Sequence, residues 1–551
     1  MEGIPITIEE QTFLWDPDVP SPSSLPLPWN PKPISKLGIP MIGGLMGLGL
    51  VILLVGLLFL GSDLKRMVSG ARIEDTEALQ GFIGTLAQVL SGVLGFTISV
   101  VAIVVQLSAD RFTPKVTELF LREKINFFII LFLIVSTLTA VWTALVFSVV
   151  AKPILLIWLN LILGTLSFLV LIPYFIFVFN FLRPTSIIDR IEQQTRQSII
   201  NAFRYRLDQP IQEVHQQCLS ALDEIKGIAA SAIRQRENLI MLDSLDSLKT
   251  FFLFYGTYKH KLPHHWFLLT PAVCRDPDFV SVDLAHLREI ETEKIWVELK
   301  IFRQYQAIFN ESLNELREAC YIISINTREI ADRAFQSQKD EIINLSIKFF
   351  NTYLRAVINT KDIRTGYNIL KQYRLLAESA LLNRRHSIVL DIAQYFRYYS
   401  LIAYKAGLFF LSETFAFDLC LLAQLCNYHQ SEIGVKLLEI LLKIDQDSEG
   451  EQQEITLQGI RKSQVKLAAC YLQTGQPELA QLIYHDMQHE PRHRLRTIHY
   501  ELRSTKADFW EFTDRGENFY YVEAELQPFV DQFFTWFDWQ TESHQVGDPH
   551  P

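Results

Sequence analysis

The chain has 551 residues, enough by length for several domains, and 49% of them are hydrophobic while only 20% are charged. Its formal net charge of −10 argues against a nucleic-acid partner, because phosphate binding needs clustered lysine and arginine. The six cysteines form no C-x-x-C pair, which indicates reduced thiols rather than a disulfide framework.

The first segment is proline-rich and includes DPDVPSPSSLPLPWNPKP. It carries acidic residues but no basic start of a cleavable signal peptide. A segment of this composition cannot build a hydrophobic core, so we expect a disordered cytoplasmic tail over residues 1–36. The alternative is a docking role for its proline and tryptophan residues.

Four long apolar runs follow, and a run of about 20 such residues can cross the hydrocarbon core of a membrane as a helix. They predict a four-helix transmembrane region over residues 37–183, with spans at 41–60, 82–107, 127–150 and 153–182. Lysine and arginine are more frequent near the span ends on the side that holds both termini. This bias predicts an inner-membrane protein with both termini in the cytoplasm. The spans contain no Asp, Glu, Lys, Arg or His, which disfavours a proton-coupled pump.

Small and polar residues recur along the second run at helical spacing. One helix face about 27 Å long carries all six of them: Gln88, Ser91, Gly95, Ser99, Ala102 and Gln106. One interpretation is close helix packing, with Ser136, Thr139 and Thr143 of the third run as hydrogen-bond partners. The alternative is a pore wall completed by symmetry copies, because each glutamine needs a polar partner in hydrocarbon.

The second run ends abruptly in VVQLSADRFTPK. Asp110 and Arg111 mark the water boundary, and Thr113 can cap a new helix with Pro114 at its first position and Lys115 after it. We interpret the next residues as a short interfacial helix against lipid headgroups. A loop helix packed on a soluble domain is the alternative.

The same stretch resembles a family of bacterial membrane proteins known as domain of unknown function 2254. The matching residues are Phe96, Ile98, Gln106, Leu107, Ser108, Phe112, Pro114 and Lys115. The order Thr97-Ile98-Ser99 and the charged pair Asp110-Arg111 depart from the family pattern. The resemblance covers the membrane half of the chain, and it implies a membrane location without implying any activity.

The second half predicts helix after helix, so the fold class is all-α. We expect a juxtamembrane stalk and loop over 184–285, continuous with the fourth span, a helical-repeat domain over 286–540 and a disordered tail over 541–551. A tetratricopeptide-like pattern comprises Leu467, Ala468, Tyr471, Gly475, Ala480, Tyr484 and Pro491. A fainter copy centres on Gly407, earlier in the chain by twice the tetratricopeptide repeat length. The alternative is an idiosyncratic helical domain with one similar hairpin. Arg515-Gly516, between aromatic-rich runs, predicts a small β-hairpin.

The sequence contains no P-loop, dinucleotide-binding glycine pattern, nucleophile elbow or H-E-x-x-H motif. We therefore expect no enzymatic activity, no catalytic residues, no cofactor and no metal site. The first functional hypothesis is a membrane-anchored helical scaffold that binds a protein partner through its cytoplasmic domain. The second is a homo-oligomeric ion channel whose pore is lined by the second span.

Overall fold

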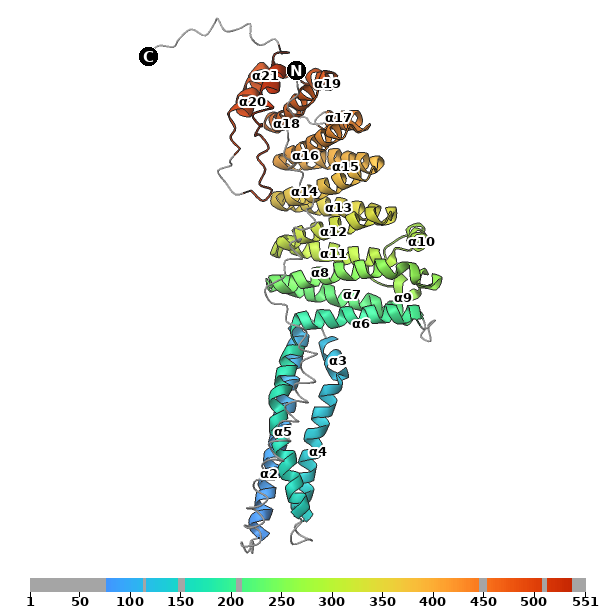
Figure 1. The fold of residues 1–551 in the computed structure, drawn as a ribbon, viewed down its shortest axis with the longest axis vertical. Coiled ribbons are helices and arrows are strands. Elements are labelled where there is room, and N and C mark those ends of the chain that lie inside the picture. The colour runs from blue at the N-terminus through green and yellow to red at the C-terminus, as the bar shows by residue number, and fades with distance from the viewer. Residues whose placement is uncertain are drawn as a thin grey trace, which may run out of the picture. The chain divides into compact units, whose positions relative to one another are not determined.

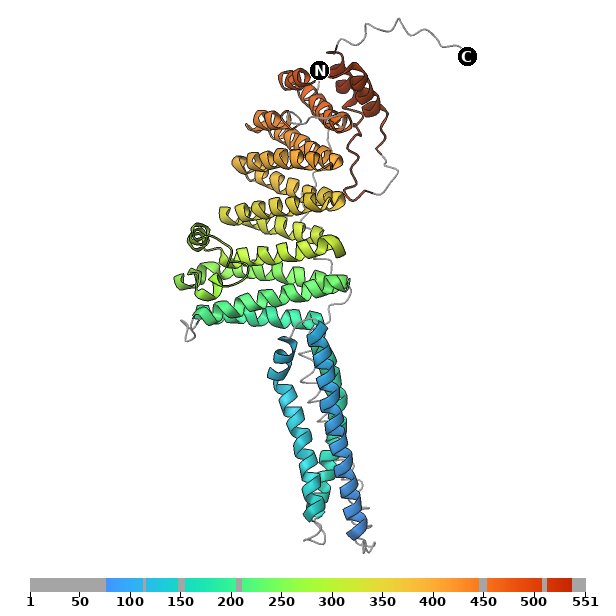
Figure 2. The same ribbon diagram turned by 180° about the vertical axis from the view of Figure 1, so that it is seen from behind.

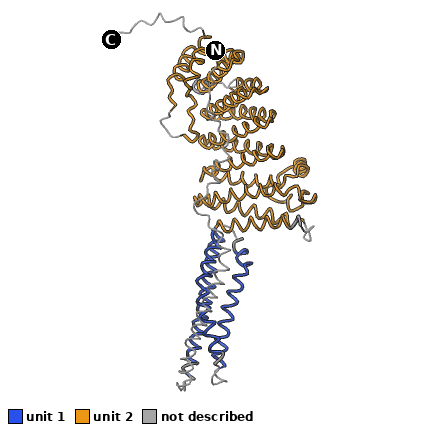
Figure 3. Tube along the Cα trace, in the orientation of Figure 1, with its two compact units in different colours: residues 1–110, 114–183 blue, residues 111–113, 184–551 orange. Residues whose placement is uncertain are grey.

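The computed structural model describes residues 76–111, 115–146, 154–204, 211–444, 453–507 and 513–537. Every regular element in these ranges is a helix, which confirms the all-α fold class (Figure 1). The chain divides into two compact units, Met1–Asp110 with Pro114–Arg183, and Arg111–Thr113 with Pro184–Pro551 (Figure 3). The predicted first span, the proline-rich leader and the C-terminal tail lie outside the described ranges.

The first unit contains the long apolar helices. Its elements are α2 (Thr76–Arg111), α3 (Lys115–Arg122), α4 (Lys124–Val146) and α5 (Ile154–Phe181). Three segments are long and apolar enough to cross a membrane, with mean hydropathies of 2.2 to 2.5: Gln80–Arg111, Lys124–Val146 and Leu156–Phe181. They coincide with the second, third and fourth predicted spans and confirm those predictions.

Two side-chain hydrogen bonds join α4 and α5 inside this unit. The hydroxyl of Ser167 donates to that of Ser136 at 3.0 Å, and the Asn160 amide donates to Thr143 at 2.7 Å. Such pairs are expected where water is absent, because an unsatisfied polar group is costly in an apolar medium. The prediction that the third span supplies partners for the glutamines of α2 is therefore wrong, since Ser136 and Thr143 bond to α5.

The helix α2 packs on its neighbours through small and aliphatic side chains. Ala87 and Leu90 cluster with Ala140 of α4. At Gly164 of α5 a side-chain methyl would lie 3.2 Å from a methyl of Leu86, so the glycine leaves room for that leucine. These contacts fix which face of α2 is turned inward.

The second unit is a stack of antiparallel helices in two layers (Figures 1 and 2). From α11 to α17 each helix packs on the next, and from α11 to α18 each also packs on the next but one, so α11, α13, α15 and α17 share one layer and α12, α14, α16 and α18 share the other. The stack begins with α6 (Pro184–Arg204), α7 (Ile211–Arg234) and α8 (Asn238–Tyr258). It continues with α11 (Trp296–Glu315), α12 (Glu318–Gln336), α13 (Asp340–Thr360), α14 (Ile363–Leu382), α15 (His386–Lys405), α16 (Phe409–Tyr428), α17 (Gly434–Leu441), α18 (Gln453–Gln473) and α19 (Pro477–Met487).

Shorter helices complete the unit. The helices α9 (Pro271–Cys274) and α10 (Leu284–Glu293) lie in the connection between α8 and α11. Two helices end the described chain, α20 (Arg492–Ser504) and α21 (Gln527–Phe534). The helix α21 packs on α18 and α20.

One turn geometry recurs along the stack at a constant step. Left-handed residues follow successive helices at Gln338, Lys361, Arg384, Gly407 and Gln430, which are evenly spaced in the sequence. At each turn the following N–H bonds a carbonyl five residues back, as Leu408 does to Ala403 at 2.9 Å. The helices between Gly407 and Gly475 are α16, α17 and α18. Two tetratricopeptide repeats would need two complete helix pairs there, and the residues that the structure describes in this interval, 408–444 and 453–474, do not contain them.

Two local expectations are corrected. The predicted continuous stalk is interrupted, because α5 ends at Phe181 and a new helix begins at Pro184, whose ring is favoured in a first helical turn. The predicted β-hairpin around Arg515-Gly516 is wrong, since residues 513–526 contain turns and no strand. Their polar groups bond to helices of the stack instead of to a partner strand.

Candidate functional site

The predicted polar stripe of α2 lies on an exposed face of the helix. All six of its residues are exposed: Gln88, Ser91, Gly95, Ser99, Ala102 and Gln106. The inward face is different and carries Ile83, Ala87, Leu90, Thr97, Val101 and Val105. A third face exposes large apolar side chains, among them Phe82, Phe96, Ile103 and Leu107. Neither stripe glutamine bonds to any residue of the described ranges. The stripe is thus a separate face, distinct from both the packed face and the apolar face.

The predicted interfacial turn is only partly described. Asp110 is exposed, α3 begins at Lys115, and Thr113 and Pro114 lie outside the described ranges. Arg111 is grouped with the second unit, where its guanidinium lies 2.8 Å from a carboxylate oxygen of Glu237. Its carbonyl also accepts a hydrogen bond from the Ser231 hydroxyl. The sequence pattern did not indicate these partners.

The predicted repeat-like residues lie in the hairpin of α18 and α19. Leu467, Ala468, Tyr471 and Ala480 are buried, and Gly475 occupies the left-handed turn with φ +74°. Tyr484 packs edge-on against Phe537, with ring centroids 4.8 Å apart. Pro491 is exposed and directly precedes α20. These residues have packing positions in the stack and form no open site.

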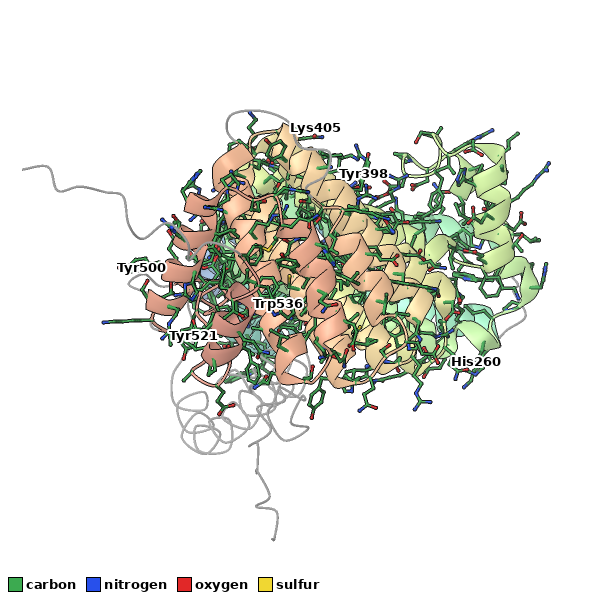
Figure 4. The ribbon with its side chains drawn as sticks, turned by 90° about the horizontal axis from the view of Figure 1, so that it is seen from above. His260, Tyr398, Lys405, Tyr500, Tyr521 and Trp536 are labelled. Carbon is green, nitrogen blue, oxygen red and sulfur yellow. The ribbon has the colours of Figure 1, made fainter. Side chains whose placement is uncertain are left out.

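The strongest candidate site is a surface of α14, α16 and α18 that is covered by the chain's own C-terminal strap, which we define as residues 513–526. The strap lies between α20 and α21 in sequence and runs beside the layer formed by these three helices (Figures 1 and 2). It has no regular secondary structure and turns at Gly516, which has φ +66°. Figure 4 shows Tyr521 at one side of the stack and Tyr398 and Lys405 at the other.

The deepest anchor of the strap is Arg515, whose side chain is fully buried. Its guanidinium donates to both carboxylate oxygens of Asp418 on α16, at 2.7 and 3.2 Å, and also to the carbonyl of Tyr367 on α14. It lies 4.3 Å from the centroid of the Tyr367 ring. A planar guanidinium matches a carboxylate in this two-point geometry, which a lysine ammonium does not reproduce.

The second anchor is Phe519, which fills an aromatic slot. Its ring stacks on Phe417 with centroids 3.9 Å apart, and it lies near the rings of Phe410 and Tyr367. Arg515 and Phe519 lie close together on the same irregular segment, and both are less than a tenth exposed. The strap is therefore held by one charged anchor and one aromatic anchor.

Polar contacts hold the strap between and beside these anchors. Asp514 accepts two hydrogen bonds from Arg364 of α14, at 2.8 and 3.0 Å, and these bonds lower the pKa of its carboxyl. The Lys466 ammonium of α18 donates to the strap carbonyls of Phe519 and Tyr521 at 3.3 and 2.6 Å. Burial lowers the pKa of Lys466. The Tyr520 hydroxyl donates to Glu413 of α16 at 2.7 Å.

Sequence reasoning missed this site, although α16 carried a signal. This helix is apolar enough to qualify as a membrane span, with a mean hydropathy of 1.5, but 72% of that window is buried inside the protein. Two carboxylates, Glu413 and Asp418, interrupt its apolar run. A charge in the middle of such a helix needs a buried partner, and an arginine elsewhere in the chain is the natural one.

Two further polar clusters lie near the start of the stack. The fully buried Lys300 ammonium of α11 bonds to Asp276, Asp278 and Asp223, with shortest distances of 2.8, 2.6 and 2.9 Å. His215 of α7 is also fully buried, between Thr270 and the Trp266 carbonyl at 3.0 Å each. Burial lowers the pKa of His215 to about 4, so the imidazole is neutral. Both clusters attach the connection between α8 and α11 to the stack.

The long apolar helices of the first unit and the helical stack of the second define an α-helical, multi-pass membrane protein. Residues 37–237 match the model of a family described as predicted membrane protein DUF2254, which confirms the resemblance found in the sequence. No curated protein matches the chain. A solved structure titled "Circular tandem repeat protein with novel repeat topology and enhanced subunit contact surfaces" is 14% identical over 84% of this chain and 95% of that chain. Its TM-score of 0.23 is too low to support an argument.

Proposed function

We propose that the protein is a membrane-anchored helical scaffold that binds a short non-helical segment of a partner protein across α14, α16 and α18. The observation that carries this proposal is the strap, because an irregular segment of the chain itself already lies on that surface. Helical stacks offer long surfaces of this kind to peptides. The bias of lysine and arginine favours a cytoplasmic location for this unit, beside the inner membrane.

The contacts of the strap specify the partner's chemistry. The buried Asp418 carboxylate selects a guanidinium, and the slot beside Phe417 accepts an aromatic ring. Lys466 binds main-chain carbonyls and is therefore tolerant of sequence. The fitting partner segment is irregular, like the strap, and carries an arginine followed, at the spacing of Arg515 and Phe519, by an aromatic residue. In the scaffold the strap competes with such a segment from within the same chain.

The test uses a labelled peptide with the strap sequence TDRGENFYYVE and the full chain in detergent. The double variant Arg515→Ala/Phe519→Ala weakens the internal competitor, so we expect it to bind the peptide more tightly than the wild type does. Adding Asp418→Asn removes the carboxylate that reads the arginine, and we expect this to abolish the gain. A peptide with lysine at the arginine position is the matched control. If the double variant remains helical and does not bind the peptide, the proposal is wrong.

We propose the oligomeric ion channel as the second candidate function. It is supported by the exposed stripe of α2, which leaves Gln88 and Gln106 without a hydrogen-bond partner in the described ranges. Symmetry copies could place these faces around a polar path. The first measurement is the mass of the detergent-solubilised complex by light scattering, and a monomer would rule out this function. In a ring of subunits, Ser99→Leu and Gln106→Leu should block ion flux without changing the fold.

A further inference from the structure

A cavity of about 500 Å³ lies in the second unit, away from the strap surface, where α8, α11, α12 and α13 meet. Its volume is in the range of small-molecule sites in proteins, roughly 300–1,000 Å³. Its floor is apolar and includes Phe252 of α8, Ile330 and Ala334 of α12, and Ile342 of α13. All four of these side chains are buried, so the floor is fixed by the packing of the stack.

The wall of the cavity carries two cations that form no ion pair with any carboxylate of the described residues. The Arg333 guanidinium makes no hydrogen bond within the described part of the chain. Among the same residues, the Lys339 ammonium bonds only to the carbonyl of Gly256, at 3.2 Å. By contrast, the nearby Lys249 of α8 pairs with Glu329 at 3.1 Å. These two positive charges make the cavity wall locally positive, whereas the chain as a whole has a net charge of −10.

The carboxylate that lines the cavity does not cancel these charges. Glu298 of α11 pairs with Lys259, with 2.6 Å between the ammonium and a carboxylate oxygen, and only 3% of its side chain is exposed. Lys339 contributes a smaller attraction to Glu298, whose pKa is nevertheless raised by burial. Both side chains of this pair are largely buried, 11% exposed for Lys259 and 3% for Glu298, so the pair lies mostly below the cavity surface. The accessible wall therefore has a surplus of positive charge above an apolar floor.

We propose that this cavity binds a small amphiphilic oxyanion, a phosphate ester or carboxylate carried on a short aliphatic group. The anionic head lies between Arg333 and Lys339, which supply charge-assisted hydrogen bonds. The aliphatic group lies on the floor formed by Phe252, Ile330 and Ile342. The site is independent of the proposed partner surface, because it uses none of the residues that hold the strap.

The test is isothermal titration calorimetry of the full chain in detergent, with hexyl phosphate, hexanoate and inorganic phosphate as separate ligands and a micelle-only blank. We expect saturable binding of at least one hexyl ligand, and much weaker binding of inorganic phosphate, which lacks the aliphatic group. The variant Arg333→Gln/Lys339→Gln should weaken that binding roughly tenfold or more, because it removes both charged donors. The two hexyl ligands distinguish a phosphate site from a carboxylate site.

Two further variants keep the test independent of folding. Arg288→Gln/Lys405→Gln removes two exposed cations that line no part of this cavity, and it should leave binding unchanged. Thr257→Trp places a bulky ring at an exposed position of the cavity rim and should reduce binding with both cations intact. Three results would each overturn the proposal: no saturable binding of either hexyl ligand, equal binding of inorganic and hexyl phosphate, or undiminished binding in both cavity variants.

Discussion

Replacing Lys300 by methionine tests the buried ionic cluster that holds the connection between α8 and α11. The substitution keeps most of the side-chain volume and removes the ammonium that bonds to three aspartates. Asp278 keeps a bond from Gln304 at 2.6 Å, and Asp223 is partly exposed beside Lys226. The Asp276 carboxylate is destabilised most, because its side chain is only 5% exposed and loses both of its hydrogen bonds from Lys300.

Removing one partner from a buried ion pair typically costs about 3–5 kcal/mol, because the remaining charge is left uncompensated. We expect Lys300→Met to lower the free energy of unfolding of the second unit by an amount in this range. Adding Asp276→Asn removes the most buried orphaned charge and should recover a large part of the loss. The matched control is Lys226→Met, whose ammonium lies 3.4 Å from Asp223 and is 35% exposed. A solvent-exposed pair of this kind contributes less than about 1 kcal/mol.

The measurement is hydrogen–deuterium exchange of the full chain in detergent, followed by mass spectrometry of peptides that cover residues 268–283. In the Lys300→Met variant these peptides should exchange much faster, while peptides from α14 to α16 change little. The double variant with Asp276→Asn should be intermediate, and Lys226→Met should match the wild type. Unchanged protection of residues 268–283 in Lys300→Met would refute the reasoning that the ammonium holds this connection.

Three other predictions concern single side chains. The pKa of His215 is lowered to about 4 by burial, so the folded state binds fewer protons than the unfolded state as the pH falls. The free energy of unfolding, measured by denaturant titration at several pH values, should therefore decrease by about 3 kcal/mol between pH 6.5 and pH 4 because of this histidine. In His215→Gln this part of the pH dependence should vanish, and an unchanged pH dependence would contradict the assignment. Arg384 follows α14 with φ +57°, so Arg384→Gly should stabilise the fold by about 1 kcal/mol and raise the unfolding midpoint. Arg385→Gly is the control, because Arg385 has a negative φ of −89° and gains no such relief, so the midpoint should not rise. Phe519 is buried in the aromatic slot, so Phe519→Ala should cost about 3 kcal/mol in chemical denaturation; a loss below about 1 kcal/mol would show that the slot contributes little.

The membrane spans could be predicted from the sequence because the signal is local. An apolar run of sufficient length is visible without knowing its neighbours, and Gln80–Arg111 coincides with the predicted second span. The strap could not be predicted in this way, since Arg515 and Asp418 are 97 residues apart in the chain. The aromatic residues around Arg515-Gly516 suggested pairing of two strands, whereas Phe519 and Tyr520, which the structure describes, have their partners on helices of the stack.

The repeat length of the stack could not be predicted from the sequence, for a different reason. Glycine is the usual residue at a left-handed turn, so a search for repeated glycines finds Gly407 and Gly475. The other turns at the constant step use Gln338, Lys361, Arg384 and Gln430 instead. The two glycines alone are compatible with a pair of tetratricopeptide repeats. Only the turns without glycine show that the repeating step is a single helix with its turn.

The constant step has a consequence for how the stack can change in length. Each step reverses the chain direction and moves the chain from one layer to the other. Successive helices therefore alternate between the two layers along the sequence. Loss or gain of two consecutive steps keeps every later helix in its own layer. Loss or gain of a single step exchanges the layers for all helices that follow, which would turn the strap surface of α16 and α18 to the opposite side. We therefore expect this unit to accept the loss or gain of helices in pairs and not singly.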